Sequence, residues 1–205
     1  MPERDDEFDA QLADAGDDRA GIEDVDAVDP LDDPDGDDED DDYPEDATEE
    51  EVDLVAALYR EDGEPSGVAL AGETANDLDA LIGALRRVPG DAGAVGVVSI
   101  EDDFFVFVRV RGKKVQVLLS DAIAANDWPI ARDVADYLGA DIPDDEDDSE
   151  PIGDLDMFVD VGLPEIDLEA LCSDLDTEPL ETIEAIVERL GFSDPYDKIA
   201  TEFDL

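Results

Sequence analysis

Histidine is missing from the 205-residue chain, and cysteine occurs once, at Cys172. Without histidine no Ser-His-Asp or Cys-His arrangement is available for nucleophilic catalysis. Neither a His-containing nor an all-Cys zinc site can form, and one cysteine excludes an intramolecular disulfide. We therefore expect a protein that is not an enzyme and that binds no metal or other cofactor.

Long apolar runs are also missing. No stretch approaches the ~18 residues that span a bilayer, and the N-terminus, MPERDDEFDA, lacks the apolar segment of a signal peptide. Anionic lipid headgroups repel an acidic surface. We therefore expect a cytoplasmic protein that does not contact membranes.

Basic residues are scarce, because twelve Lys and Arg stand against sixty-four Asp and Glu, a formal net charge of −52. Nucleic-acid binding requires Lys and Arg to neutralise phosphates, so we expect no direct contact with nucleic acid. A basic protein surface is the natural partner of such a chain. Solubility, or adaptation to a salty cytoplasm, would also favour an acidic composition.

The charge divides the chain into four regions. Residues 1–50 hold twenty-five acids and two arginines. We predict a disordered acidic tail there, because such a segment buries too little apolar surface to offset its ordering entropy. For residues 51–140 we predict an α+β module, for 141–151 an acidic linker, and for 152–205 a C-terminal region of short helices.

Strand and helix patterns alternate within the module. VDLVAALY (52–59), VALAGE (68–73) and AVGVVSI (94–100) are typical of strands, whereas NDLDALIGALRRVPG has helical spacing with Asn76 or Asp77 as N-cap. SDAIAANDWPIARDVADYLG predicts one or two further helices. The fold class is therefore α+β, a mostly antiparallel sheet of about five strands with helices packed on one face. A small all-helical C-terminal region follows it.

The segment FFVFVRVRGKKVQVLL (104–119) predicts a β-hairpin. Gly112-Lys113 suits a two-residue type II′ loop. That register pairs Val106, Val108 and Val110 with apolar residues of the second strand, so this face belongs to the core. A slip of one residue would turn the charged side chains inward, so the register is well specified.

The opposite face of the hairpin is apolar at its base and positive toward the turn. Arg109, Arg111 and Lys114 lie there and are candidates for contact with an anion or RNA. Alternatively, they are solvated charges that keep the strand soluble, or they bind acidic segments of the same chain. An exposed charge contributes less than ~1 kcal/mol, so Arg109→Gln should barely change stability.

The C-terminal region contains short helices, each with one apolar side. We expect them to pack on each other, on the sheet or on a partner, because short isolated helices are unstable. Cys172 lies on such a side and is expected to behave as a small buried hydrophobe. The side chains that we consider candidates for partner contact are Phe158, Leu171, Ile183 and Phe203.

The order strand–strand–helix–strand–hairpin, with EDDFFVFVRV followed by VLLSDA, resembles a known family. After an acidic gap, GDLDMFVDVGLP, LEALC and AIVERLGFSD continue the resemblance, which covers roughly residues 52–205. The family is that of the actinobacterial tRNA adenosine deaminase-associated proteins. Its name implies association with the enzyme that converts a wobble adenosine to inosine. That enzyme is recognised by H-x-E and P-C-x-x-C motifs, which are absent here, so the resemblance implies an accessory protein.

Two functional hypotheses follow. In the first, the chain is a non-catalytic accessory or adaptor protein that binds a basic partner, either the tRNA adenosine deaminase or another basic protein. In the second, it is an acidic interaction module that mimics nucleic acid in a basic groove, unconnected to tRNA editing. Competition with nucleic acid would favour the second. A small enzyme of unknown reaction is a third alternative, since carboxylate pairs can do acid–base work.

Overall fold

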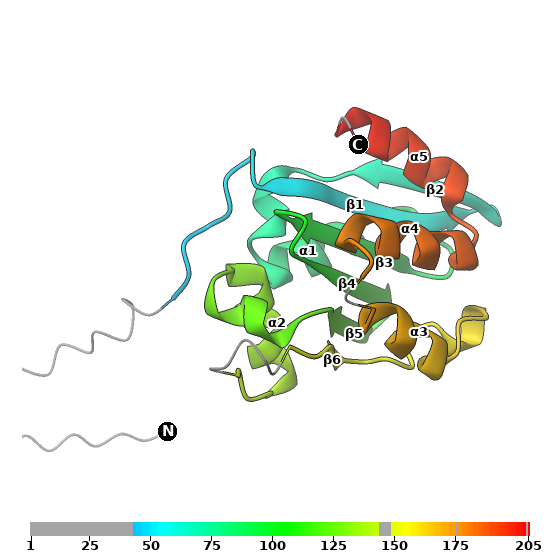
Figure 1. Cartoon of the computed structure of the whole chain (residues 1–205). Coiled ribbons are helices and arrows are strands. Elements are labelled where there is room, and N and C mark those ends of the chain that lie inside the picture. Colours follow the sequence, from blue (N-terminus) through cyan, green and yellow to red (C-terminus); the bar gives the residue numbers. More distant parts are fainter. Residues whose placement is uncertain (1–42, 144–148, 175, 204) are drawn as a thin grey trace, which may run out of the picture. The chain divides into compact units, whose positions relative to one another are not determined.

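The computed structural model describes residues 43–143, 149–174, 176–203 and 205. Within this part of the chain, one antiparallel sheet has the strand order β2-β1-β3-β4-β5-β6 (Figure 1). The strands are β1 (Val52–Glu61), β2 (Glu64–Ala69), β3 (Ala94–Ile100), β4 (Phe104–Arg111), β5 (Lys114–Leu119) and β6 (Ile152–Gly153). The predicted α+β class is confirmed, and β6 adds a strand to the five that were expected.

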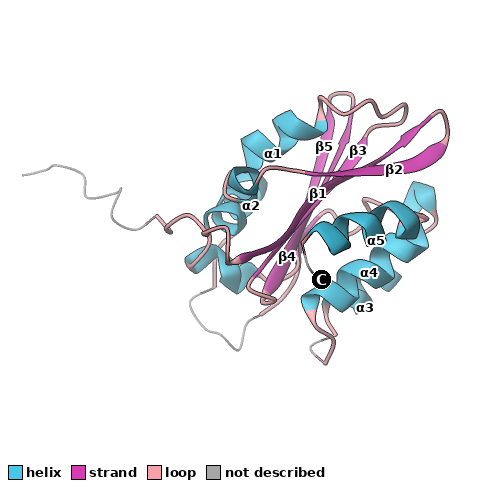
Figure 2. Cartoon of the chain, turned by 90° about the horizontal axis from the view of Figure 1, so that it is seen from above, coloured by secondary structure: helices cyan, strands magenta, loops and turns pink. Residues whose placement is uncertain are grey.

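Helices cover both faces of the sheet. They are α1 (Leu78–Leu85), α2 (Pro129–Leu138), α3 (Glu165–Cys172), α4 (Pro179–Leu190) and α5 (Ser193–Glu202), with short 3₁₀ turns η2 (Gly72–Ala75), η3 (Ala122–Asn126) and η5 (Val159–Val161). Figure 2 shows α1 and α2 on one side of the sheet and α3, α4 and α5 on the other. Among the described residues, no helix combines the length and apolar character needed to cross a membrane.

The β4–β5 hairpin has the predicted register. Val108 pairs with Val117, and Arg111 pairs with Lys114 across the turn. Gly112 adopts a φ of 58°, a left-handed conformation that glycine reaches without steric cost. The alternation of side chains along β4 therefore sends Val108 into one core layer and Phe107 into the other.

The two helices of the first layer, α1 and α2, begin or end at residues that the sequence marks as helix caps. The Asp77 side chain accepts a hydrogen bond of 2.7 Å from the Ala80 N–H at the start of α1. Pro129 occupies the first turn of α2, and Gly139 ends that helix with a φ of 63°. Both helices bury their apolar sides on the sheet face that contains Val106, Val108 and Val110, so the predicted core face is confirmed.

The sequence did not decide whether the C-terminal helices pack on each other, on the sheet or on a partner. Helices α4 and α5 pack directly on the sheet and bury Ile183, Val187 and Ile199 against its second face. The contact with β2 is close, because a Cβ atom at Gly67 would lie 2.8 Å from Ile199 Cδ1. The C-terminal helices therefore belong to the same compact unit as the sheet.

Ordered contacts begin before Glu51, where the sequence placed the start of the module. Ala47 is buried, and its N–H and carbonyl both bind the Asn76 amide, at 2.8 and 2.9 Å. The Tyr43 hydroxyl donates to Asp133 on α2 at 2.5 Å. Residues 43–50 therefore pack on the module because they carry an apolar side chain and satisfied backbone groups. The rest of the predicted tail lies outside the described residues.

Candidate partner-binding cleft

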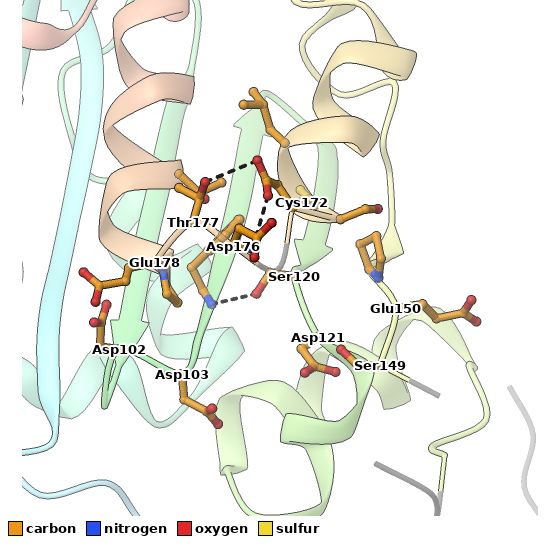
Figure 3. A pocket seen from close by; sticks show the side chains of 17 residues that line it. Asp102, Asp103, Ser120, Asp121, Ser149, Glu150, Cys172, Asp176, Thr177 and Glu178 are labelled. Atoms are coloured by element: carbon orange, nitrogen blue, oxygen red, sulfur yellow. Dashed lines mark hydrogen bonds between the residues drawn. The ribbon is translucent and has the colours of Figure 1, made fainter. Parts of the chain in front are cut away.

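A cleft of about 400 Å³ opens between the sheet and the C-terminal helices (Figure 3). One wall is formed by the β3–β4 turn and the end of β5, and the other by the segment that joins α3 to α4. Seven carboxylates line it, with no Lys or Arg among the lining residues. These acids are Asp102, Asp103, Asp121, Glu150, Asp174, Asp176 and Glu178. The arrangement is therefore suited to a cationic ligand.

Apolar groups form the deeper part of the cleft. Phe105 is buried beneath it, and the side chains of Leu171 and Cys172 line it from α3. Burial raises the pKa of the Cys172 thiol to about 12, so this cysteine is a neutral thiol near pH 7 and a poor nucleophile. A ligand with an apolar stem and a cationic end, such as Lys or Arg, would match both parts of the cleft.

Burial, together with neighbouring carboxylates, raises the pKa of one acid in the cleft, Asp103. Burial is the main cause that raises the pKa of Asp103, and the charges of Asp121 and Asp127 raise it further. A positive side chain placed beside Asp103 would lower that pKa again, because an opposite charge favours the carboxylate. Binding of a basic segment would therefore favour release of the proton from a protonated Asp103.

The wall between α3 and α4 is held by a local turn. Asp174 accepts hydrogen bonds of 3.2 Å from the Asp176 N–H and from the Thr177 hydroxyl (Figure 3). Ser120 Oγ accepts from the Phe105 N–H at 2.9 Å on the opposite wall. Among the described residues, no three carboxylates or thiols lie close enough to ligate one metal ion. The acids are spread along the walls rather than directed at one point.

Only two of the four predicted partner contacts are accessible. Phe158 and Ile183 are fully buried, because they fill the space between the sheet and its second helical layer. Their role is core packing, and the interpretation as partner contacts is corrected for these two. Leu171 is half-buried and lines the cleft, whereas Phe203 is half-buried at the end of α5, away from it.

The expected exposure of Arg109 is also corrected, because its side chain is only 8% exposed. Asp160 accepts from Arg109 Nη1 at 2.5 Å and from Nη2 at 3.0 Å, and Arg109 also donates to the Met157 carbonyl. The guanidinium lies 5.8 Å from the ring centroid of Phe158. The second helical layer covers the face on which Arg109 lies and buries it.

Arg111 reaches the same carboxylate, at 2.6 Å from Asp160, whereas Lys114 is exposed. Hydrogen bonding to Arg109 is the main cause that lowers the pKa of Asp160, and the charges of both arginines add to it. We call Arg109, Arg111 and Asp160 the arginine clamp. One of the alternatives considered for the hairpin, binding to acidic groups of the same chain, is therefore realised for two of the three candidate cations, Arg109 and Arg111.

Comparison with known proteins places the chain in a family. A family model described as Rv3753c-like tRNA adenosine deaminase-associated protein matches residues 53–193. The chain belongs to this family. Protein Rv3753c of Mycobacterium tuberculosis is 35% identical over 141 residues, which cover 67% of this chain and 82% of that protein. No solved structure matches.

The family match includes all of the cleft and the whole arginine clamp, and it ends where α5 begins. Sequence reasoning identified neither the cleft nor Asp160. The only signal for the clamp was that Arg109 continues the face of Phe105 and Phe107, which is apolar enough to need a cover. For the cleft the sequence contains no signal, since acidic residues occur in every region of the chain.

Proposed function

We propose that this family member is a non-catalytic accessory protein that binds tRNA adenosine deaminase, with the acidic cleft as the contact surface. Family membership carries the proposal, because the family's name associates these proteins with that enzyme. An enzyme that binds tRNA must present clustered Lys and Arg. Those of its basic side chains that the tRNA leaves free would be complementary to a cleft with seven carboxylates and no cation among its lining residues.

Apolar contacts would complete the interface. Leu171 lies in the cleft, and the same helix exposes Ile166 to 69%. Val159 and Val161 are also exposed, to 53% and 46%, but they flank Asp160 of the arginine clamp and do not line the cleft, so we do not assign them to this interface. Charge complementarity mainly raises the association rate and selects the partner, whereas buried apolar anchors supply most of the affinity. We therefore expect the carboxylates to orient the deaminase on the cleft, and the apolar residues of α3 to slow its dissociation.

The test compares two glutamates at opposite ends of α4, one at its N-cap and one in its last turn. Glu178 lies in the cleft at the start of the helix, and Glu188 is exposed in its last turn outside the cleft. Binding of the full-length chain to immobilised deaminase of the same organism is measured at several salt concentrations. Glu178→Lys should slow association and flatten its salt dependence, whereas Glu188→Lys should leave both nearly unchanged.

Equal effects of the two substitutions would show that only the total charge matters, and no complex at low salt would contradict the proposal as a whole. Adding tRNA separates the two functional hypotheses. A complex that persists with tRNA supports an accessory protein. Displacement of the chain by tRNA would instead indicate an acidic mimic of nucleic acid in the deaminase's groove.

A further inference from the structure

The end of the sheet at which β4 turns into β5 gathers most of the chain's positive charge. Tyr59 near the end of β1 pairs with Ala94 at the start of β3, and Ala94 pairs with Val110 near the end of β4. The end of α1 also lies here, because Leu85 and Arg86 line one hollow together with Arg111. Seven of the twelve basic residues lie at this hairpin end: Arg60, Arg86, Arg87, Arg109, Arg111, Lys113 and Lys114. Four of these, Arg109, Arg111, Lys113 and Lys114, are close together in the sequence, and the fold brings the other three to the same end.

Three of these seven basic residues already have a structural role. Arg60 donates to the last carbonyl of α4 at 3.0 Å, a stabilising position for a cation. Arg109 and Arg111 form the arginine clamp with Asp160. The remaining four are exposed and form no ion pair with any residue that the structure describes: Arg86, Arg87, Lys113 and Lys114.

Neither turn geometry nor solubility requires lysine at the hairpin. The β1–β2 turn uses Asp62 with Gly63, and the β3–β4 turn uses Glu101, Asp102 and Asp103. Acidic residues therefore serve in the other two turns of the same sheet. Since the chain carries a net charge of −52, it has no need of cations to stay soluble. The positive charge at the β4–β5 turn is therefore better accounted for by a ligand.

A hollow of about 390 Å³ separates the end of α1 from the hairpin. Arg86 and Arg111 are both among its lining residues, together with residues 90–93. Asp91 is the one acid among its lining residues, and its Oδ2 already accepts from the Asp62 N–H at 2.8 Å. The hollow and the exposed cations around it therefore form a surface that is open to an anion.

We propose that the hairpin end contacts the phosphate backbone of the tRNA held by the deaminase. These four cations, which have no ion-pair partner among the described residues, lie just after α1 and at the β4–β5 turn. They fit a polyanion better than a single small anion, because each cation can neutralise a different phosphate. The cleft lies at the opposite ends of β4 and β5. One end of the sheet can therefore bind the enzyme while the other stays free for RNA.

This contact departs from the expectation, drawn from the net charge, of no direct contact with nucleic acid, and the total charge restricts it to the assembled complex. The free chain repels RNA, so it should not capture tRNA from solution. At 0.15 M salt, charges beyond the Debye length of ~8 Å are largely screened. A short-range contact can therefore form once the deaminase holds the tRNA close. This inference rests on the proposed function, and the experiment separates the two.

The experiment measures binding of labelled tRNA to the preformed complex of deaminase and full-length chain at several salt concentrations. Formation of that complex is first recorded by its mass without tRNA. Arg87→Glu and Lys113→Glu should each weaken tRNA binding at least about fivefold at 0.15 M salt and reduce the salt slope by about one. The matched control is Lys198→Glu, an exposed lysine on α5, which should change neither quantity.

Each other outcome contradicts the inference in a distinct way. A complex that binds tRNA equally well with all three variants overturns it and leaves the proposed function intact. If Lys113→Glu weakens binding of the deaminase itself rather than of tRNA, the hairpin end contacts protein, and the RNA proposal is wrong. Failure of the complex to form at all overturns both proposals.

Discussion

Removing one partner of the arginine clamp should destabilise the fold in an asymmetric way. Asp160→Asn leaves Arg109 charged at 8% exposure without its carboxylate. Breaking a fully buried ion pair from one side costs about 3–5 kcal/mol. Asp160 itself is 47% exposed, so solvent screens part of the interaction. We therefore expect Asp160→Asn to lower the free energy of unfolding by about 2–3 kcal/mol.

Arg109→Met should cost less, although it removes the same ion pair. Methionine keeps the apolar contact with Phe158, and Asp160 remains half-exposed beside Arg111. Replacing a buried charge by a hydrophobic residue is often close to neutral. The lost hydrogen bond to the Met157 carbonyl still costs about 1 kcal/mol. This estimate replaces the expectation that a change at Arg109 barely affects stability.

Urea unfolding of the full-length chain measures both effects. With a slope near ~2 kcal/mol per molar urea, the midpoint for Asp160→Asn should fall by about 1–1.5 M. The control is Asp197→Asn, an exposed carboxylate on α5. Removing a negative charge there relieves self-repulsion, so its midpoint should stay the same or rise. Equal midpoints for the two Asp→Asn variants, or a larger loss for Arg109→Met, would refute this account of the clamp.

Three further predictions concern the hydrogen bonds of Asn76, the dependence of stability on pH, and the reactivity of Cys172. Asn76→Ala removes both hydrogen bonds to Ala47 and should cost about 1–2 kcal/mol in the same urea assay; an unchanged midpoint would show that residues 43–50 are not held there. The folded state binds the proton of Asp103 more tightly than the unfolded state does, since its pKa is raised. Stability should therefore increase as pH falls from neutral through that pKa. The pKa of Asp160 is lowered, so the contribution of the clamp is present above pH ~4 and lost below it. A melting temperature that falls steadily from pH 7 to 3, with no rise at any point, would contradict the predicted effect of Asp103. Cys172, with a pKa of about 12, should react with iodoacetamide at pH 8 more than about a hundredfold slower in the native than in the unfolded chain; equal rates would show an accessible thiolate.

The sequence was sufficient for features that depend on local rules. The register of the hairpin follows from Gly112 and from alternation, because any slip would bury charge. The strand predicted at residues 94–100 is β3, and one of the two predicted N-caps, Asp77, holds α1. Short one-sided helices in the C-terminal region indicated that an apolar surface had to cover them, without indicating which surface.

The second face of the sheet was harder to predict for an electrostatic reason. Arg109 at the end of an apolar face is typical of a boundary with solvent, unless a carboxylate arrives to pair with it. Asp160 does so from 51 positions away, in a chain where any of sixty-four acids could serve equally well. The cleft has the same difficulty, because its walls come from four distant segments and its acids are indistinguishable from the rest in sequence.

The two helical layers are made at different times on the ribosome. The strands that present Phe105, Phe107 and Leu118 are complete by residue 119, yet α4 and α5, which cover that face, lie between residues 179 and 202. At about 5–20 residues per second, the roughly 80 intervening residues take some 4–16 s to synthesise. During that time the nascent chain carries an uncovered aromatic face. Mutual repulsion between chains so rich in carboxylates would keep neighbouring nascent molecules apart until the last helices arrive.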